Sequence, residues 1–409
     1  CTFTNNNGGN GGGFFNFGWN GVANPTFTTC TFSGNNAGYG SQGGAVHNYA
    51  NGGGSAANPV FTNCSFLNNS INAGSGGAVF NNADEANGIA NPTFDNCSFI
   101  GNGGWNGGAG GAVYNTSARN NFCFPGGVAN PTFSNCLFSG NYTGNEGGAI
   151  RNYQANCAAY SNPTFTNCSF VGNYASVNGV MLNSTGFPIF KNCILWGNNS
   201  GIADNFGGST TVTYSIVEGG YAGTGNLNAD PLFVTAPGAP PSSSGDLHLQ
   251  AASPAIDAGT ASGAPANDLD DFPRPSGAGV DMGVYEFQVA PPTCYADTDG
   301  DSYGDPDAPG ACGAGYVADN TDCNDNCAAC YSSAAEVCDG EDNDCDSEID
   351  EGVLSTFYAD NDDDGFGSFN SGTVQGCSPP PGYSANDDDC NDNLASINPD
   401  APEVCNLLA

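Results

Sequence analysis

The sequence predicts an all-β protein in which a parallel β-solenoid is followed by a loop-rich tail stabilised by disulfides and calcium. Three observations predict this. The motif N-P-x-F-x-N-C-x-F-x-x-N recurs along the first half of the chain, and no segment has the pattern of an amphipathic helix. The last 116 residues hold 27 acidic side chains and ten cysteines but no lysine or arginine. Each such repeat is one structural unit, which buries its apolar face by stacking on its neighbours.

The repeats share a cysteine, a phenylalanine three residues before it, a Phe or Leu two residues after it and an asparagine five residues after it. A spacing of two fits a strand, whereas a spacing of three requires one extra residue at a corner. Asparagine tolerates the left-handed conformation that such a corner needs. The repeat cysteines are Cys1, Cys30, Cys64, Cys97, Cys136, Cys168 and Cys193, and the predicted corner residues are Asn63, Asn96, Asn135, Asn167 and Asn192.

A second recurring element, G-G-A-V or G-G-A-I, follows about a dozen residues after the cysteine in four units, at 43–46, 76–79, 110–113 and 147–150. Short strands joined by corners, one coil per unit, place equivalent residues above one another about 4.8 Å apart. We interpret the cysteine column as small buried hydrophobic residues, with metal binding or disulfides inside the column as the alternative. The asparagine column is expected to hydrogen-bond from coil to coil.

The motifs "NPTFTNCSF" and "GGAV" resemble those of right-handed parallel β-helix repeat proteins with a pectate-lyase-like fold. The resemblance covers residues 1–215 and implies a right-handed parallel β-helix there. A fold of this kind does not by itself imply sugar cleavage.

A terminal segment is expected at 216–288, where the repeat decays. The strings "SPAIDAG" and "VDMGVYEF" resemble the terminal segment of secreted bacterial β-helix proteins. We expect this segment to cover the open edge of the last coil. Asp268, Asp270 and Asp281 are candidates for a structural cation, with turn-forming carboxylates as the alternative. Residues 289–293, V-A-P-P-T, are a predicted linker.

Two related acidic units follow, at 294–352 and, incompletely, at 353–409. Aspartates at alternate positions in glycine-containing loops gather carboxylates around one point, and Ca²⁺ takes six to eight oxygen ligands. The candidate ligands are Asp297, Asp299, Asp301, Asp305, Asp322, Asp325, Asp342, Asp344, Asp346, Asp350, Asp360, Asp362, Asp364, Asp389 and Asp392. The alternative is a merely solvated acidic tail.

The strings "YADTDGDSYGD" and "EVCDGEDNDCDSEIDEG" resemble the secreted metal-binding motif repeats, and they are similar to thrombospondin type 3 calcium repeats. The resemblance implies metal binding over residues 294–409, with copper associated with one branch of the family. Hard oxygen ligands and the lack of histidine in this region favour calcium.

Composition narrows the partners and the compartment. Four basic residues against 41 acidic ones exclude nucleic acid, because phosphate binding needs clustered cations. Nineteen cysteines favour an oxidising, extracellular or cell-surface location. The sequence shows no apolar run that would span a membrane and no signal peptide, and it begins inside a repeat, so we expect a processed or partial product. Cys123 and Cys157, in insertions of consecutive units, are expected to form a disulfide.

For function, we expect a structural protein of the cell surface or extracellular space that is not an enzyme. End-to-end self-association into filaments is a further expectation. The first alternative is an adhesin or glycan-binding module that uses aromatic side chains near turns: Trp19, Trp105, Tyr39 and Tyr174. The second is a polysaccharide lyase or hydrolase, which is disfavoured because the titratable residues of the repeats fall at different positions. His47 and Arg151 share a repeat offset but lie three coils apart.

Overall fold

The computed structural model describes residues 1–409 except for 84–86, 107, 118–126, 154–160, 289–292 and 403–409. Within the described residues it is all-β and contains no helix, as predicted. The chain forms two compact domains, the solenoid domain Cys1–Val289 and the tail Ala290–Ala409, so the predicted linker lies at their boundary. Cys123 and Cys157 fall outside the described residues.

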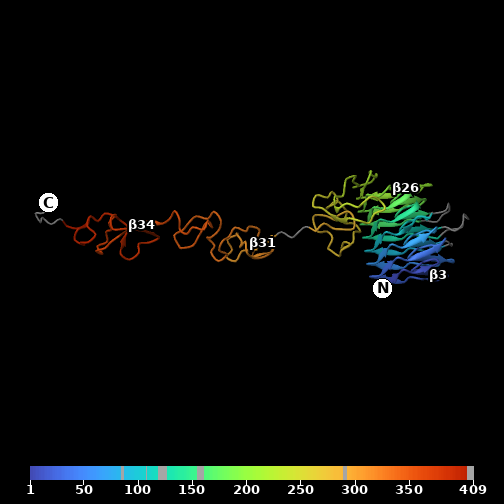
Figure 1. Cartoon of the computed structure of the whole chain (residues 1–409), viewed down its shortest axis with the longest axis horizontal. Helices are drawn as coiled ribbons and strands as arrows, with labels where there is room; N and C mark the ends of the chain where they lie inside the picture. The colour runs from blue at the N-terminus through green and yellow to red at the C-terminus, as the bar shows by residue number, and fades with distance from the viewer. Residues whose placement is uncertain (84–86, 107, 118–126, 154–160, 289–292, 403–409) are drawn as a thin grey trace. The chain divides into compact units, whose positions relative to one another are not determined.

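In the solenoid domain, each coil adds short strands to parallel sheets that stack along the solenoid (Figure 1). We call these sheets A to D in the order in which the chain visits them. Sheet A contains β1 (Thr2–Thr4), β5 (Thr31–Ser33), β9 (Ser65–Leu67), β13 (Ser98–Ile100), β17 (Leu137–Ser139), β21 (Ser169–Val171), β25 (Ile194–Trp196) and β28 (Ile216–Val217). Sheet B contains β2 (Asn7–Gly8), β6 (Asn36–Tyr39), β10 (Ser70–Asn72), β14 (Gly103–Gly104), β18 (Tyr142–Glu146) and β22 (Tyr174–Val177).

The other two parallel sheets complete each coil. Sheet C contains β3 (Phe14–Trp19), β7 (Val46–Asn51), β11 (Val79–Ala83), β15 (Val113–Thr116), β19 (Ile150–Tyr153), β23 (Met181–Ser184) and β26 (Ile202–Asn205). Sheet D contains β4 (Thr26–Thr28), β8 (Val60–Thr62), β12 (Thr93–Asp95), β16 (Thr132–Ser134), β20 (Thr164–Thr166), β24 (Ile189–Lys191) and β27 (Thr211–Thr213). The pairing keeps the sequence repeat in register: Phe32, for example, pairs with Phe3 and Phe66.

The solenoid core is built from two phenylalanine columns that face each other. Phe61 of sheet D stacks on Phe94 of the next coil at 4.9 Å, and Phe66 of sheet A stacks on Phe99 at 4.7 Å. Between the columns the rings meet edge to face, as Phe61 and Phe66 do at 5.5 Å. Both are favoured arrangements of aromatic pairs. Because the rings are fully buried, the repeat phenylalanines supply much of the apolar surface that holds the coils together.

The corner between sheets D and A is formed as the sequence predicts. The five predicted asparagines have positive φ, between +51° and +55°, and Thr29 takes the same place in the second unit with φ +52°. The six cysteines from Cys30 to Cys193 that follow these corners are buried free thiols. Each donates to the carbonyl oxygen two residues earlier, as Cys97 does to Asp95 at 3.3 Å. The column therefore consists of small buried side chains without disulfides, which was the favoured interpretation.

Asparagine columns satisfy the backbone where the strands end. Asn69 donates through Nδ2 to Asn102 Oδ1 at 2.9 Å and to Phe32 O at 2.8 Å, and the same pattern continues in neighbouring coils. A second column explains the asparagine that precedes each proline: Asn58 Oδ1 accepts the backbone N–H of Asn91 at 2.7 Å. The amides of the first column are buried and those of the second are half-buried, and both provide hydrogen bonds that the irregular backbone requires.

The terminal segment covers the last coil and also one side of the solenoid. Leu227 extends the edge of β28 through a parallel bridge to Ile216, and Tyr221 packs against the end of the core, as expected. The rest of the segment, including the antiparallel pair β29 (Phe233–Thr235) and β30 (Asp246–Leu249), contributes to a second apolar cluster. That cluster contains the outward-facing side chains of sheet A in the later coils, such as Val171 and Ile194. The segment is therefore a side cover as well as an end cap.

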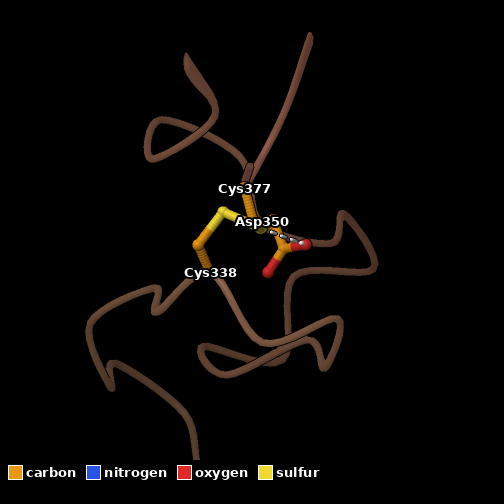
Figure 2. Close-up of side chains that lie close together, drawn as sticks. All are labelled: Cys338, Asp350 and Cys377. Carbon is orange, nitrogen blue, oxygen red and sulfur yellow. Dashed lines mark hydrogen bonds between the residues drawn. A yellow bond between two sulfur atoms is a disulfide. The ribbon is translucent and has the colours of Figure 1, made fainter. Parts of the chain in front are cut away.

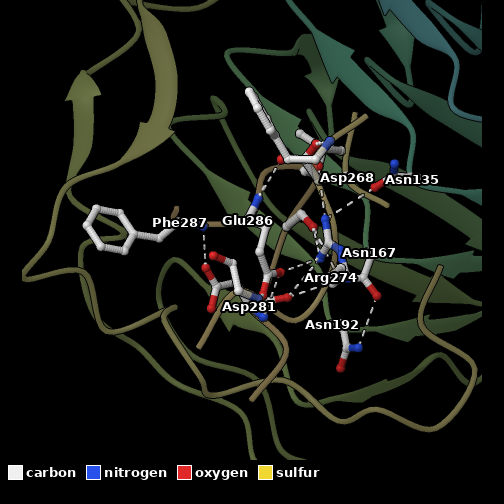
Figure 3. A network of polar contacts seen from close by, with 12 residues as sticks. Asn135, Asn167, Asn192, Asp268, Arg274, Asp281, Glu286 and Phe287 are labelled. Atoms are coloured by element: carbon white, nitrogen blue, oxygen red, sulfur yellow. Dashed lines mark hydrogen bonds and ion pairs between the residues drawn. The ribbon is translucent and has the colours of Figure 1, made fainter. Parts of the chain in front are cut away.

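Polar contacts fix this cover to the corner asparagines, as Figure 3 shows. Asn167 donates to Asp281 O at 3.0 Å, and Asn192 donates to Thr260 O at 2.8 Å. The candidate cation ligands Asp268 and Asp281 use their carboxylates to accept backbone N–H groups. Their arrangement agrees with the turn-forming alternative.

The tail holds two small antiparallel sheets of the same construction, one in each of the two acidic units. The first contains β31 (Thr293–Ala296), β32 (Pro309–Ala311) and β33 (Tyr316–Val317). The second contains β34 (Ser355–Ala359), β35 (Thr373–Gly376) and β36 (Tyr383–Ser384). In both, the first strand is central and pairs with the other two.

Candidate metal centres

Four disulfides hold the described part of the tail: Cys294–Cys312, Cys323–Cys345, Cys327–Cys330 and Cys338–Cys377. The second tail unit lacks counterparts of several cysteines of the first, among them Cys294. Buried Phe357 stands where the first unit has Cys294, so the pairing seen in Cys294–Cys312 is not available to Cys377, the counterpart of Cys312. Cys377 bonds to Cys338 of the first unit instead. The cysteine at this position thus forms a covalent link between the two tail units.

In the first unit, aspartates from two separate loops converge. Asp301 Oδ1 accepts the N–H of Tyr303 at 2.8 Å, and Asp322 Oδ1 accepts the N–H of Asn324 at 2.8 Å. Each carboxylate therefore folds its own turn with one oxygen, in the manner of an Asx turn. The two loops are joined by Asp325, which accepts both the N–H and the hydroxyl of Thr298 at 2.6 Å.

The second oxygens of these carboxylates point into a common centre. Asp299, Asp301 and Asp322 each bring one ligand atom within 4.8 Å of the others, and Asp297, Asp299 and Asp325 form an adjoining group. Oδ2 of Asp299, Asp301 and Asp322 is buried and has no hydrogen-bond partner. Water does not replace a partner at Asp322, because this residue is only 2% exposed. Buried carboxylate oxygens without donors are costly, so this centre has the character of a cation site.

The second unit repeats the arrangement. Asn361 donates to Asp392 at 2.8 Å and 2.6 Å, as Thr298 does to Asp325. Asp389, the counterpart of Asp322, is 4% exposed and uses Oδ1 for the N–H of Asn391, whereas its Oδ2 has no partner. Both oxygens of Asp362 are likewise buried without a partner. The second tail unit therefore repeats the buried, unpartnered carboxylate oxygens of the first.

A third acidic group lies in the loop that follows Cys338. Asp342, Asp344 and Asp346 come together as predicted. Glu336 and Glu351, which the sequence analysis did not include, form a group with Asp344. Glu336 also accepts the N–H groups of Asn343, Asp344 and Asp350, so it folds the loop around itself. No alternating spacing marks these glutamates, and the E-V-C string common to both units was the one available signal.

Four predicted ligands serve other contacts. Asp305 Oδ1 accepts the N–H of Asp307, and Asp360 accepts the N–H groups of Asp364 and Gly365. Asp350 lies with Cys338 and Cys377. Asp364 gives Oδ1 to the N–H of Phe366 and Oδ2 to the side chain of Asn398.

The centres are electrostatically strained without a cation. Burial, followed by the charges of Asp299, Asp301 and Asp325, raises the pKa of Asp322. Burial and the carboxylates of Asp364 and Asp389 likewise raise the pKa of Asp362. A carboxyl whose pKa is raised by folding stabilises the fold at low pH and loses that stabilisation as the pH rises. A bound cation would remove this loss at neutral pH.

Comparison with known proteins agrees with this location. Residues 322–351 and 389–408 match a family model described as "Putative metal-binding motif", whose label refers to copper. The matched ranges contain Asp322 and the third acidic group in the first unit, and Asp389 in the second. No curated protein and no solved structure matched the chain. The tail thus carries a metal-binding motif, on a chain whose remaining part is an all-β solenoid.

Proposed function

We propose that the tail binds Ca²⁺ and that the protein is an extracellular or cell-surface structural protein. The observation that carries the proposal is the repeated set of buried, unpartnered carboxylate oxygens, seen at Asp322 in the first unit and at Asp389 in the second. Equivalent residues are arranged alike in the two tail units, where Asp322 and Asp389 each open the same D-C-N-D-N string. A ligand common to both units accounts for this arrangement.

The ligand chemistry favours calcium over copper. The converging groups are carboxylates, and the two histidines of the chain lie outside the tail, at positions 47 and 248. Calcium prefers several hard oxygen ligands in flexible geometry, whereas copper prefers imidazole or sulfur. The copper label of the family model makes copper the necessary comparison in any test.

Calorimetric titration of the full chain with Ca²⁺, and separately with Cu²⁺, tests the proposal. The variants Asp322→Asn and Asp389→Asn are each expected to lose one calcium site. Asp307→Asn removes the same charge from an exposed position and is the matched control. Wild-type protein that binds copper but not calcium would contradict the calcium proposal, and unchanged binding by both site variants would contradict the site.

The disulfides support the proposed extracellular location, because such bonds persist in oxidising compartments. The described residues include no helix with the length and apolarity to cross a membrane. We propose a non-catalytic role for the solenoid. His47 and Arg151 lie in one column of sheet C, separated by two intervening coils, and both are buried, which supports a structural use of these side chains.

Glycan binding is a second candidate, favoured by one aromatic surface. The ring of Trp105 lies 4.9 Å from that of Tyr142 and 5.6 Å from that of Tyr174, and Trp105 is 56% exposed. Trp19 and Tyr39 lie on other strands, β3 and β6. Neutral glycans suit a surface on a chain with net charge −37. Glycan-array binding that is lost in Trp105→Ala but kept in Trp19→Ala would support this function, and absence of binding to neutral glycans would contradict it.

End-to-end self-association of the 409-residue chain is also a proposal. Phe3, Phe14 and Phe27 are half-buried rings packed against the core, and their exposed apolar area supports contact with an apolar partner surface. Light scattering in calcium tests it. A monomer at high concentration would end the filament proposal.

A further inference from the structure

A buried carboxylate lies against the disulfide that links the two tail units, as Figure 2 shows. Asp350 is 8% exposed, and its Oδ2 lies 3.5 Å from Cys377 Sγ. Its Oδ1 accepts the N–H groups of Asp339 and Gly340, each at 3.0 Å. The carboxylate is therefore held in place by one oxygen and directed at the sulfur by the other.

The contact between Asp350 and Cys377 is not a hydrogen bond while the disulfide is intact. A disulfide sulfur carries no proton, so it cannot donate to Oδ2. A carboxylate oxygen that is buried without a donor carries a desolvation cost. The cost is removed if Cys377 is a thiol that donates to Oδ2, or if a cation is bound by this oxygen together with the sulfurs.

We propose that Cys338, Cys377 and Asp350 form a redox-gated metal site, which takes a thiophilic divalent ion such as Zn²⁺ when the disulfide is reduced. One ligand atom from each of the three residues already lies within 4.8 Å of the others. Two thiolates and one carboxylate are ligands that zinc accepts in tetrahedral sites, with water in the fourth position. The exposed position of Cys377 gives a reductant and an ion access to the site.

The reaction needs a dithiol reductant, and its balance is simple. A thiolate of the reductant attacks Cys377 Sγ, and the Cys338 thiolate leaves. The second thiol of the reductant then attacks the mixed disulfide, releasing Cys377 and a cyclic disulfide. Two electrons and two protons pass from the dithiol to the cysteine pair. Binding of Zn²⁺ to the two thiols then releases two protons.

The ion would preserve the link between the units. In the oxidised protein the link is the Cys338–Cys377 bond, across a sequence separation of 39 residues. In the reduced protein the link is sulfur–zinc–sulfur, oriented by Asp350. The site differs from the carboxylate centres in its sulfur ligands, so its zinc binding is tested apart from the calcium proposal. Asp350 adjoins the third acidic group, because its N–H donates to Glu336 at 3.0 Å.

Zinc titration of the full chain after reduction and removal of the dithiol under anaerobic conditions tests the site. Reduced wild-type protein is expected to bind one more equivalent of Zn²⁺ than reduced Cys338→Ser/Cys377→Ser. With Cd²⁺ as a second probe, the ultraviolet sulfur-to-cadmium charge-transfer absorption should fall by the contribution of two thiolates in that variant. Asp350→Asn should keep the equivalent but weaken it by roughly tenfold or more.

The matched control is Cys294→Ser/Cys312→Ser, which removes another disulfide of the same tail. It should retain the additional zinc equivalent. Peptide mapping of the oxidised variants, showing that the remaining disulfides have formed, keeps the comparison valid if a variant is less stable. Equal zinc stoichiometry in reduced wild-type and reduced Cys338→Ser/Cys377→Ser would overturn the proposal, as would wild-type affinity in Asp350→Asn.

Discussion

The guanidinium of Arg274 lies 3.5 Å from the carboxylate of Glu286, and both side chains are enclosed, at 0% and 1% exposure. Arg274 also donates to the carbonyl oxygens of Gly283 and Val284. Burial lowers the pKa of Arg274, while the surrounding carboxylates oppose that shift. One buried cation thus holds together the last part of the terminal segment and donates to the corner residue Asn135 of the solenoid.

Replacement of Arg274 by methionine should destabilise the solenoid domain by about 3–5 kcal/mol, because it leaves the Glu286 charge buried without its partner. Urea unfolding followed by intrinsic fluorescence measures the change. The double variant Arg274→Met/Glu286→Gln should recover part of the loss, since it removes the uncompensated charge. Equal stability of the single and double variants would show that the ion pair is not the cause.

Asn167 allows the two roles of a corner asparagine to be separated. It is fully buried, has φ +51°, and donates to carbonyl oxygens of the terminal segment. Asn167→Gly keeps the backbone conformation and loses the side-chain bonds, whereas Asn167→Ala loses both. We therefore expect alanine to be less stable than glycine by about 1 kcal/mol. Thermal unfolding of both variants checks the order, which should reverse if the side chain alone matters.

The cysteine column should behave as a packed apolar column. Cys97 and Cys136 are fully buried free thiols. Cys136→Ser replaces the thiol by a more polar hydroxyl that can keep the bond to Ser134 O, as Ser215 bonds to Thr213 O in the last coil, so it should cost about 1 kcal/mol. Cys136→Ala, the control, should cost less than serine. In the native protein a thiol reagent should leave these cysteines unmodified until denaturant is added, and rapid modification of Cys136 under native conditions would contradict the burial.

The solenoid was predictable because the same motif recurs once in each coil, so each position is seen several times in the sequence. The corner at Asn167 follows from a spacing of three between Phe165 and Cys168. The side cover was less visible, although its signal exists: the outward position of sheet A is Thr31 or Ser65 in early coils and Ile194 in a covered one. This change from polar to apolar residues does not recur along the sequence, so it can be recognised only after the strands of sheet A are known.

The metal centres were predicted as clusters but not oxygen by oxygen. Alternate aspartates indicate where carboxylates gather, and Asp299, Asp301 and Asp322 do gather. Which oxygen is left free depends on the turns, as the different contacts of Asp301 and Asp364 show. The link through Cys377 depended on pairing across units, which one sequence leaves open.

The pH dependence of the terminal segment should follow His248. Its Nδ1 lies 2.5 Å from Asp246 and its Nε2 lies 2.7 Å from Asp270, and its ring stacks on Tyr285 at 4.1 Å. Partial burial opposes the charge of His248, but the hydrogen bonds and charges of the two aspartates outweigh it and raise its pKa. The resulting stabilisation is fully present below the ordinary histidine pKa of about 6.5 and is lost as the pH rises through the raised value.

Nuclear magnetic resonance titration can follow His248 without interference, because the chain has two histidines and burial lowers the pKa of His47 to about 3. Between pH 5 and pH 9, roughly the range in which histidine charge changes, one imidazole should titrate. Asp270→Asn should lower its pKa by removing one of the two facing charges. The same variant should make thermal stability less dependent on pH across this range. If the pKa of His248 is the same in the variant and the wild type, Asp270 does not stabilise the imidazolium.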